Sequence, residues 1–290
     1  LEKAGRTLVA RFPGSEPSNI ALSWSPSGER LLISSGGTDI LVLKRDGSEQ
    51  LRPTEKIPSL QSVWWNEGAA EDLMVTTGSE TRRMHPVTGE SSTVLAIPVT
   101  TLFDRDGRLF FTRENPENTH VVSRVGTAEE VIAILPQGSY QFIESRLPYL
   151  LLYEETRGRM TILDADNHDQ PILLQTETTQ AVWSPTGSTR LLYTNGFETH
   201  LFSPQTLTDT LVDRVSRPVA SVAWHPAGTA IVLAHPESVV AYDLHEPGFM
   251  QTKLNNARDV SRVFIDDKGA FLFFLGTVDN VYGLYRQPVR

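Results

Sequence analysis

Cysteine is absent from this sequence of 290 residues. Its absence excludes disulfide bonds, thiolate nucleophiles and cysteine-based zinc sites together. Long apolar runs are also missing, since no hydrophobic stretch approaches the roughly 20 residues that a membrane-spanning helix needs. The sequence therefore predicts no membrane span within this chain. It leaves the compartment open, because an exported protein of this size can also lack cysteine.

Positive charge is scarce, with 26 Lys and Arg against 35 Asp and Glu, and the formal net charge is −9. The basic residues form no broad cluster, and phosphate contacts need clustered Lys and Arg, so the composition disfavours nucleic acid as a partner. The chain begins at Leu1 rather than Met, and no charged-then-apolar leader follows. We expect it to be a trimmed or mature fragment of a larger protein.

Catalytic motifs are missing as well. The sequence contains no Gly-x-Ser-x-Gly nucleophile turn, Walker phosphate loop, Gly-x-Gly-x-x-Gly fingerprint or His-Glu-x-x-His helix. We therefore expect a protein that is not an enzyme and that binds no cofactor.

What the sequence does contain is an internal repeat. The same turn, an aromatic residue followed by a Pro and a Gly, occurs three times in the chain, and a short apolar strand follows each copy. The three copies are Trp24-Ser25-Pro26-Ser27-Gly28, Trp183-Ser184-Pro185-Thr186-Gly187 and Trp224-His225-Pro226-Ala227-Gly228. Each copy predicts a strand, a tight turn and a second strand.

Degenerate copies of the turn fill the rest of the chain. The aromatic position recurs every 38 to 41 residues, with Ile143 in the weakest copy, at Trp24, Trp65, Phe103, Ile143, Trp183, Trp224 and Phe264. A period near 40 residues with four strands per repeat is typical of β-propeller blades. The sequence therefore predicts an all-β fold, a seven-bladed β-propeller of four-stranded antiparallel blades.

The ends of the chain predict how this ring closes. The last repeat provides only three strands before Arg290, and Thr7 to Phe12 forms a strand-like segment that belongs to no repeat. Pairing this N-terminal strand as the outer strand of the seventh blade would remove an exposed sheet edge. We expect one domain over 1–290, with blades at about 19–57, 58–97, 98–137, 138–177, 178–217, 218–257, and 258–290 together with 6–12.

The Trp-Ser-Pro-x-Gly turn at Trp24 and Trp183 resembles that of the TolB-type propellers and, more loosely, the propeller domains of prolyl oligopeptidases. The resemblance to WD-repeat propellers is weaker, because pairs such as Tyr242-Asp243 occur without the Gly-His that begins a WD repeat. The resemblance covers essentially the whole chain and implies the fold. It favours a periplasmic or cell-surface location, and it leaves the function open between docking platform, ligand site and enzyme lid.

The tryptophans have a predicted role in packing. Trp24, Trp65, Trp183 and Trp224 share one repeat position, which predicts that they are buried equivalents between blades. Trp64 precedes a core position, so its side chain is predicted on the opposite face of the strand, at another blade interface.

Two groups of residues are candidates for a metal site. Asp164, Asp166 and Asp169 gather oxygen ligands as Ca²⁺ requires, although Asp is also a favoured turn residue and a plain turn explains them equally. His225, His235 and His245 fall in three successive turns of one blade, too far apart to share a metal, and are predicted to be independent surface residues.

The connections that lead into the innermost strands are predicted to gather on one face of the blades, which we call the lead-in face. Loops on a repetitive scaffold are where recognition can be placed, so we expect the partner-binding residues there. Gln61 and Thr100 belong to this set, and the strongest candidates are Tyr140, Gln180, Arg217, Arg258 and Arg262. The three arginines favour an acidic peptide or a carboxylate.

The predicted function is a non-catalytic propeller that docks a protein or peptide partner as part of a larger chain or envelope assembly. Two alternatives stay open. The propeller could be an accessory domain that gates an enzyme, or it could bind a small ligand in its central channel.

Overall fold

The computed structural model describes residues 20–35, 39–66, 71–105, 107–187, 189–245 and 249–289. They belong to two compact units, unit 1 (Leu1–Phe142) and unit 2 (Ile143–Arg290). In the described ranges the only helix is a single turn, α1 (Pro53–Lys56), and the other regular elements are strands. No helix among these residues is long and apolar enough to cross a membrane.

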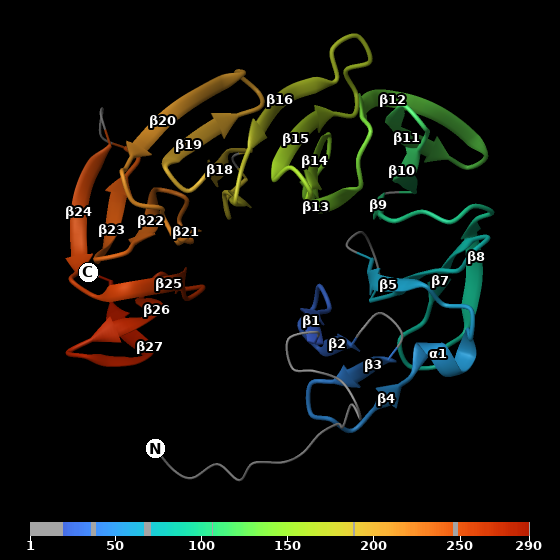
Figure 1. Ribbon diagram of the computed structural model, residues 1–290, viewed down its shortest axis with the longest axis horizontal. Coiled ribbons are helices and arrows are strands. Elements are labelled where there is room, and N and C mark those ends of the chain that lie inside the picture. The colour runs from blue at the N-terminus through green and yellow to red at the C-terminus, as the bar shows by residue number, and fades with distance from the viewer. Residues whose placement is uncertain are drawn as a thin grey trace. The chain divides into compact units, whose positions relative to one another are not determined.

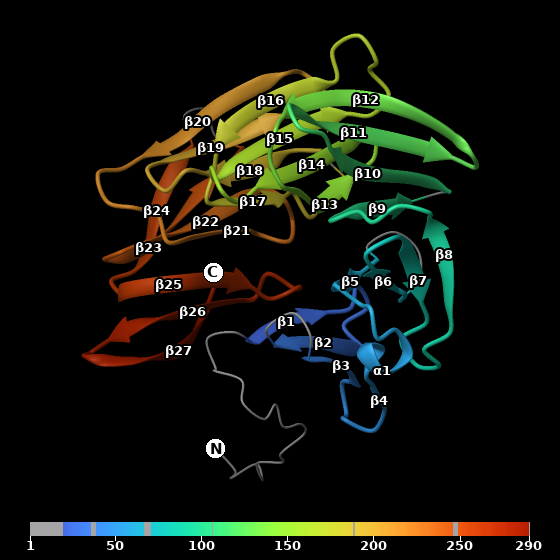
Figure 2. The ribbon, with the colours of Figure 1, turned by 45° about the vertical axis from the view of Figure 1, so that its right-hand side comes forward.

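Unit 1 contains three antiparallel sheets whose strands pair in chain order (Figure 1). The first consists of β1 (Ile20–Trp24), β2 (Arg30–Ser35), β3 (Asp39–Lys44) and β4 (Gln50–Leu51). The second consists of β5 (Ser62–Trp65), β6 (Leu73–Thr76), β7 (Thr81–Met84) and β8 (Ser91–Leu95). The third consists of β9 (Leu102–Arg105), β10 (Arg108–Glu114), β11 (Asn118–Val125) and β12 (Ala128–Pro136). Helix α1 follows β4 and lies beside β3 (Figure 2).

The remaining sheets repeat this order. The fourth consists of β13 (Tyr140–Arg146), β14 (Tyr149–Glu154), β15 (Arg159–Asp164) and β16 (Ile172–Glu177). The fifth consists of β17 (Gln180–Trp183), β18 (Leu191–Thr194), β19 (Glu198–Ser203) and β20 (Thr208–Arg214). The sixth consists of β21 (Ser221–Trp224), β22 (Ala230–His235), β23 (Ser238–Asp243) and β24 (Met250–Asn255). The seventh has three described strands, β25 (Arg258–Ile265), β26 (Phe271–Val278) and β27 (Val281–Pro288).

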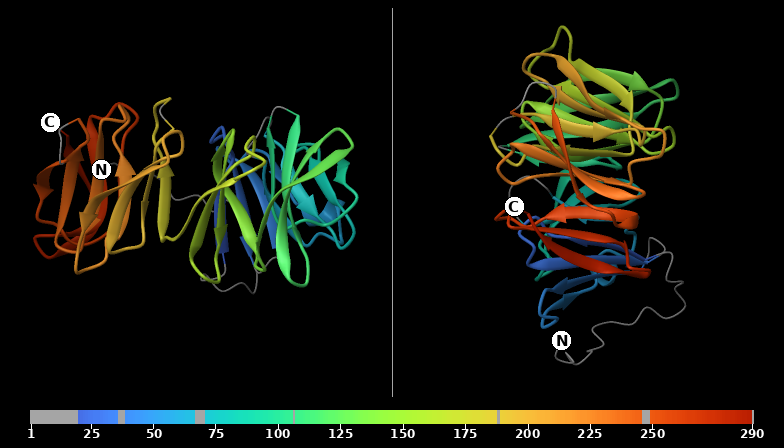
Figure 3. Two further views of the ribbon diagram at one scale, coloured as in Figure 1. Left: turned by 90° about the horizontal axis from the view of Figure 1, so that it is seen from above. Right: turned by 90° about the vertical axis from the view of Figure 1, so that its left-hand side faces the viewer.

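The seven sheets coincide with the seven predicted repeats, which confirms the all-β, seven-bladed propeller fold. Neighbouring strands of each sheet run in opposite directions, as Figure 3 shows. The predicted closing strand, Thr7 to Phe12, lies outside the described residues. The assignment of the whole chain to one domain stays a prediction.

The repeated turn forms as the sequence predicts at Gly28 and Gly228, whereas Gly187, in the third full copy, does not have a left-handed φ. Gly28 and Gly228 have φ values of 72° and 68°, in the left-handed region that glycine tolerates. Their backbone N–H groups donate to the carbonyls of Ser25 and His225 over 2.8 Å, which closes a tight turn between the first two strands of a blade. A side chain at either position would strain this turn.

The hydrophobic core lies between successive blades. Trp65, from the second blade, packs with Leu32 and Val42 of the first, and Trp224, from the sixth, packs with Leu192 of the fifth. The indole Nε1 of Trp65 also donates to the Ser23 carbonyl over 2.9 Å. The second and sixth blades therefore each cover one face of the blade before them.

The tryptophan predictions are met at four of five positions. Trp65, Trp183 and Trp224 are buried, and Trp64 packs on the opposite face of its blade, against Met74 and its neighbours. Trp24 contradicts the prediction, because 53% of it is exposed. The indole Nε1 of Trp224 donates to the Val182 carbonyl of the fifth blade over 2.9 Å, as that of Trp65 does to a carbonyl of the first blade.

Candidate functional site

The lead-in face of each blade is the edge where its first strand begins, its second strand ends and its third strand begins. Tyr140 starts β13 on this edge, but only 1% of it is exposed. Its hydroxyl donates to the carbonyl of Pro136 over 3.0 Å, which holds the connection from β12 to β13 in place. The structure thus places Tyr140 inside the blade rather than on a surface that could meet a partner.

Gln180 also makes internal contacts. Its Nε2 donates to the Ala220 carbonyl over 2.7 Å, and its Oε1 accepts from the Val222 N–H over 3.0 Å. The amide therefore joins the start of β17 to the start of β21, as a backbone peptide group would. The contact connects the fifth and sixth blades and leaves little of this side chain for recognition.

The three arginines lie on the surface of unit 2. The Arg217 side chain is 65% exposed and pairs with the equally exposed Glu237. Arg258 donates from Nη2 to the Asn280 side-chain oxygen over 2.6 Å. Arg262 is exposed on β25, and it has no ion pair within the described ranges of the chain.

One turn brings two of these connections together. The Asp259 N–H donates to the carbonyl of Pro236 over 2.8 Å, and Pro236 directly precedes Glu237, the partner of Arg217. The connections that carry Arg217 and Arg258 therefore meet at the turn between β22 and β23. Asp259 has a φ of 53°, and β25 is irregular between Arg258 and Arg262.

A pocket of about 390 Å³ opens beside this turn. Its lining comes from the connection after β20 and from the turn after β22, and consists of Arg214, Val215, Ser216, Arg217, His235, Glu237 and Ser238. The His235 side chain is only 13% exposed, and its Nε2 lies 3.5 Å from Oδ2 of Asp213. The prediction of a surface histidine is therefore wrong at His235, because β22 carries it against the preceding blade.

The imidazole of His235 predicts a pH dependence. Burial lowers the pKa of His235 below its usual 6.5, and the Asp213 carboxylate opposes this shift with a smaller effect. Below about pH 6.5 the unfolded chain takes up this proton more readily than the folded chain, so the free energy of unfolding should fall towards about pH 5. The H235Q variant is expected to show a smaller fall, measured by denaturant unfolding at each pH.

The matched control is H245Q, because His245 lies in the same blade with its side chain 69% exposed. An equal loss of stability from pH 7 to pH 5 in H235Q and in the unmodified chain would contradict the assignment to His235.

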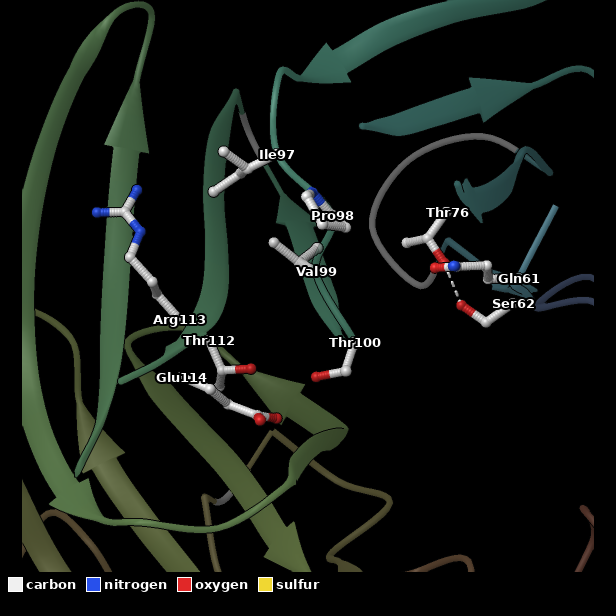
Figure 4. A pocket seen from close by; sticks show the side chains of 10 residues that line it. All are labelled: Gln61, Ser62, Thr76, Ile97, Pro98, Val99, Thr100, Thr112, Arg113 and Glu114. Carbon is white, nitrogen blue, oxygen red and sulfur yellow. Dashed lines mark hydrogen bonds between the residues drawn. The ribbon is translucent and has the colours of Figure 1, made fainter. Parts of the chain in front are cut away.

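A larger pocket lies on the lead-in face of unit 1, between the second and third blades. It has a volume of about 540 Å³. Its lining comes from the starts of β5 and β9 and the ends of β6 and β10 (Figure 4), and consists of Gln61, Ser62, Thr76, Ile97, Pro98, Val99, Thr100, Thr112, Arg113 and Glu114. Gln61 and Thr100 were predicted on this face, whereas Thr112 and Glu114 lie at the end of a second strand, and no feature of the sequence singles them out.

The acidic loop after β15 forms a turn rather than a shared ligand set. The Asp166 N–H donates to Oδ1 of Asp164 over 3.0 Å, and the Asn167 side chain accepts from the Gln170 N–H. Across the described part of the chain, no three His, Cys, Asp or Glu side chains are placed to hold one metal ion. The candidate cation ligands Asp164, Asp166 and Asp169 are therefore not brought together.

The sequence reasoning also missed a polar row across the fifth blade. The Tyr193 hydroxyl donates to Oδ2 of Asp209 over 2.8 Å, and its ring stacks on His200 with centroids 5.1 Å apart. Burial, followed by the hydrogen bond to Asp209, raises the pKa of Tyr193. The phenol therefore stays a hydrogen-bond donor at neutral pH, and the row joins three neighbouring strands.

The sequence matches no family model and no curated protein. Solved structures do resemble the chain. The C-terminal WD40 domain of Sif2 is 15% identical with a TM-score of 0.56, covering 95% of this chain and 82% of that one. A chain in the crystal structure of the mitotic checkpoint complex is 16% identical with a TM-score of 0.53, covering 98% and 96%.

An oligogalacturonate lyase from Vibrio parahaemolyticus is 10% identical with a TM-score of 0.52, covering 95% of this chain and 92% of that one. At such identities the similarity shows the fold alone. The fold is that of the WD-like and TolB-type propellers, as the repeated turn indicates.

Proposed function

We propose that this protein is a non-catalytic docking module, and that the lead-in face of unit 2 binds an acidic segment of a protein or peptide partner. The observation that carries the proposal is the convergence of the Arg217 and Arg258 connections on the turn at Pro236. Loops held together on a rigid β scaffold are suited to recognition.

The charges at this turn support a carboxylate-bearing partner. Arg258 contacts a neutral amide, and Arg262 has no ion pair among the residues that the structure describes, so neither positive charge is neutralised by a direct ion pair. The pair of Arg217 with Glu237 is exposed on both sides, and such pairs contribute only about 0 to 1 kcal/mol. A partner carboxylate can therefore displace Glu237 at little cost and bind the arginine fork with two oxygens.

The fold comparison agrees with a docking role. One structurally similar chain is part of a protein assembly, the mitotic checkpoint complex. That a lyase has a similar fold leaves an enzymatic role open in general. We propose a non-catalytic role because the sequence contains none of the nucleophile, phosphate-loop and metal motifs considered above.

A charge-reversal experiment tests the proposal. A fluorescein-labelled Gly-Glu-Gly-Glu-Gly peptide serves as the acidic probe, and its binding to the full chain is measured by fluorescence anisotropy at low and at physiological salt. The triple variant R217E, R258E and R262E is expected to bind the probe at least about tenfold more weakly, because attraction becomes repulsion.

The matched control is the triple variant R45E, R105E and K268E, whose positions are exposed and change the net charge equally. Arg45 and Lys268 lie in turns and Arg105 ends β9, all on the opposite edge of the blades. It is expected to keep most of the binding. Equal binding by the two triple variants would show that only the net charge matters and would contradict the proposed face.

A further inference from the structure

The pocket beside Arg217 in unit 2 has a histidine in its wall. It has a volume of about 390 Å³ and lies between the connection after β20 and the turn that joins β22 to β23. His235 ends β22 and is part of the lining, with its side chain 13% exposed. Ser216 and Ser238 add two hydroxyl groups to this lining, and Arg217 and Glu237 contribute an exposed ion pair. An imidazole thus shares the pocket with the guanidinium of Arg217.

A carboxylate lies behind this imidazole. The Nε2 atom of His235 is buried and lies 3.5 Å from Oδ2 of Asp213, whose side chain is 16% exposed. Among the described residues, His235 is the only basic side chain within ion-pair distance of Asp213. Burial, followed by the charge of Asp213 and a hydrogen bond to it, raises the pKa of Tyr242, so this phenol stays neutral. No described cation therefore offsets the charge of Asp213 while His235 is neutral.

The arginines of the lining already have anionic partners. Arg214 pairs with Glu198 of β19 at 2.7 Å, and Arg217 pairs with Glu237. Each of these positive charges is balanced by a negative one, so the carboxylate behind the neutral imidazole leaves the surroundings of the pocket with an excess of negative charge. A partner carboxylate that enters the pocket is repelled by this excess.

We propose that this pocket is the carboxylate subsite on the lead-in face of unit 2, and that protonation of His235 strengthens the binding of an acidic partner segment. The protonated imidazole neutralises Asp213 and so removes the repulsion of the incoming carboxylate. Because Nε2 is turned towards Asp213, His235 acts through its charge. The partner oxygens bind the Arg217 guanidinium, and the hydroxyls of Ser216 and Ser238 are further donors.

The direction of the pH effect follows from the burial of His235. Burial lowers the pKa of His235 below its usual 6.5, and the Asp213 carboxylate opposes this shift with a smaller effect. The imidazole therefore takes up its proton below about pH 6.5, where the glutamates of a partner, with a usual pKa of about 4.3, keep their charge. Binding should strengthen as the pH falls through this range. By linkage, a bound carboxylate should raise the pKa of His235.

The test measures the affinity of the acidic probe against pH. Gly-Glu-Gly-Glu-Gly carries a rhodamine dye here, because the emission of rhodamine does not change in this range. Anisotropy titrations with the full chain at one ionic strength should give binding about threefold tighter, or more, at about pH 5.5 than at about pH 7.5. In NMR spectra of the unmodified chain, saturating unlabelled peptide should raise the pKa of His235 by about 0.5 or more, the linked equivalent of a threefold change.

Three variants assign the effect to this histidine. H235Q should bind equally at the two pH values, within about twofold, because glutamine takes up no proton there. D213N should bind about twofold tighter, or more, than the unmodified chain at about pH 7.5, because it removes the repelling charge and keeps an acceptor for Tyr242. The matched control is H200Q. His200 lies 3.3 Å from Glu198 and so reaches the pocket only through the partner of an arginine, and H200Q should keep the pH effect.

The outcomes separate this inference from the proposed function on which it rests. Probe binding that needs the three arginines but is equal at both pH values would overturn the role of His235 and leave the docking face standing. A pH effect that H235Q keeps, or that H200Q removes, would also overturn it. Absence of probe binding at both pH values would contradict the docking face and this inference together. If H235Q fails to fold, the unmodified chain still decides, because an unchanged pKa of His235 at saturation overturns the proposal.

Discussion

Replacing Trp224 by alanine is expected to lower the free energy of unfolding by about 3 to 5 kcal/mol, the range for truncating a large buried aromatic residue. Trp224 is 7% exposed and packs between the fifth and sixth blades. Its Nε1 donates to the Val182 carbonyl over 2.9 Å, and the Arg190 guanidinium lies 5.4 Å from the ring centroid. The substitution leaves a cavity and removes both contacts. Denaturant unfolding of the full chain, followed by circular dichroism, measures the loss.

Two comparisons separate packing from hydrogen bonding. W224F keeps an aromatic ring but loses the hydrogen bond to the Val182 carbonyl. W183F loses no hydrogen bond, because Nε1 of Trp183 has no partner among the described residues. W224F should therefore cost more than W183F, by about 1 kcal/mol. Phe197 is 49% exposed, so F197A should cost less than about 1 kcal/mol. A loss of that small size in W224A would show that Trp224 does not hold the two blades together.

The fold could be predicted because its signals are local and repeated. The Pro-x-Gly turns at Gly28 and Gly228 require a left-handed glycine, and each recurs at the same place in a period near 40 residues. Each turn joins two strands that pair with each other, so the sequence around it determines a hairpin without knowledge of distant residues. Three full copies and four degenerate ones indicated seven sheets.

The candidate site could be predicted only in part, because the contacts of a polar side chain depend on residues far along the chain. Gln180 begins an inner strand and Arg217 lies shortly before one, so the two positions look alike in sequence. Gln180 meets backbone groups of Ala220 and Val222, whereas Arg217 remains exposed. The burial of His235 against the preceding blade has no sequence signature at all, since the sequence predicts a surface residue there.

Trp24 also shows that the contacts of a side chain could not be predicted from the repeat alone. Its repeat position equals that of Trp224, yet the two differ in burial, because burial is given by the neighbouring blade and not by the turn that follows the residue. A repeat predicts equivalent local structure. It does not by itself predict equivalent surroundings, because the residues that cover a side chain come from other parts of the chain.

Gln180 gives the second large expected effect. Q180A is expected to lower the free energy of unfolding by about 1 to 3 kcal/mol, because it leaves the Ala220 carbonyl and the buried Val222 N–H without this amide. Q180E should also be destabilised at neutral pH, since its carboxylate places an acceptor against the Ala220 carbonyl. Denaturant unfolding of both variants measures the effect.

Arg217 is the matched control for Gln180, because both were predicted on the same binding face. R217A should change stability by less than about 1 kcal/mol, since its ion pair with Glu237 is exposed on both sides. The two variants should therefore have opposite effects. Q180A should lower the stability of the chain but leave the affinity of the folded chain for the acidic probe unchanged, whereas R217A should leave the stability unchanged and lower the affinity. If Q180A were as stable as the unmodified chain and bound the probe more weakly, the amide would belong to the recognition surface, and its bonds to Ala220 and Val222 would not hold the fifth and sixth blades together.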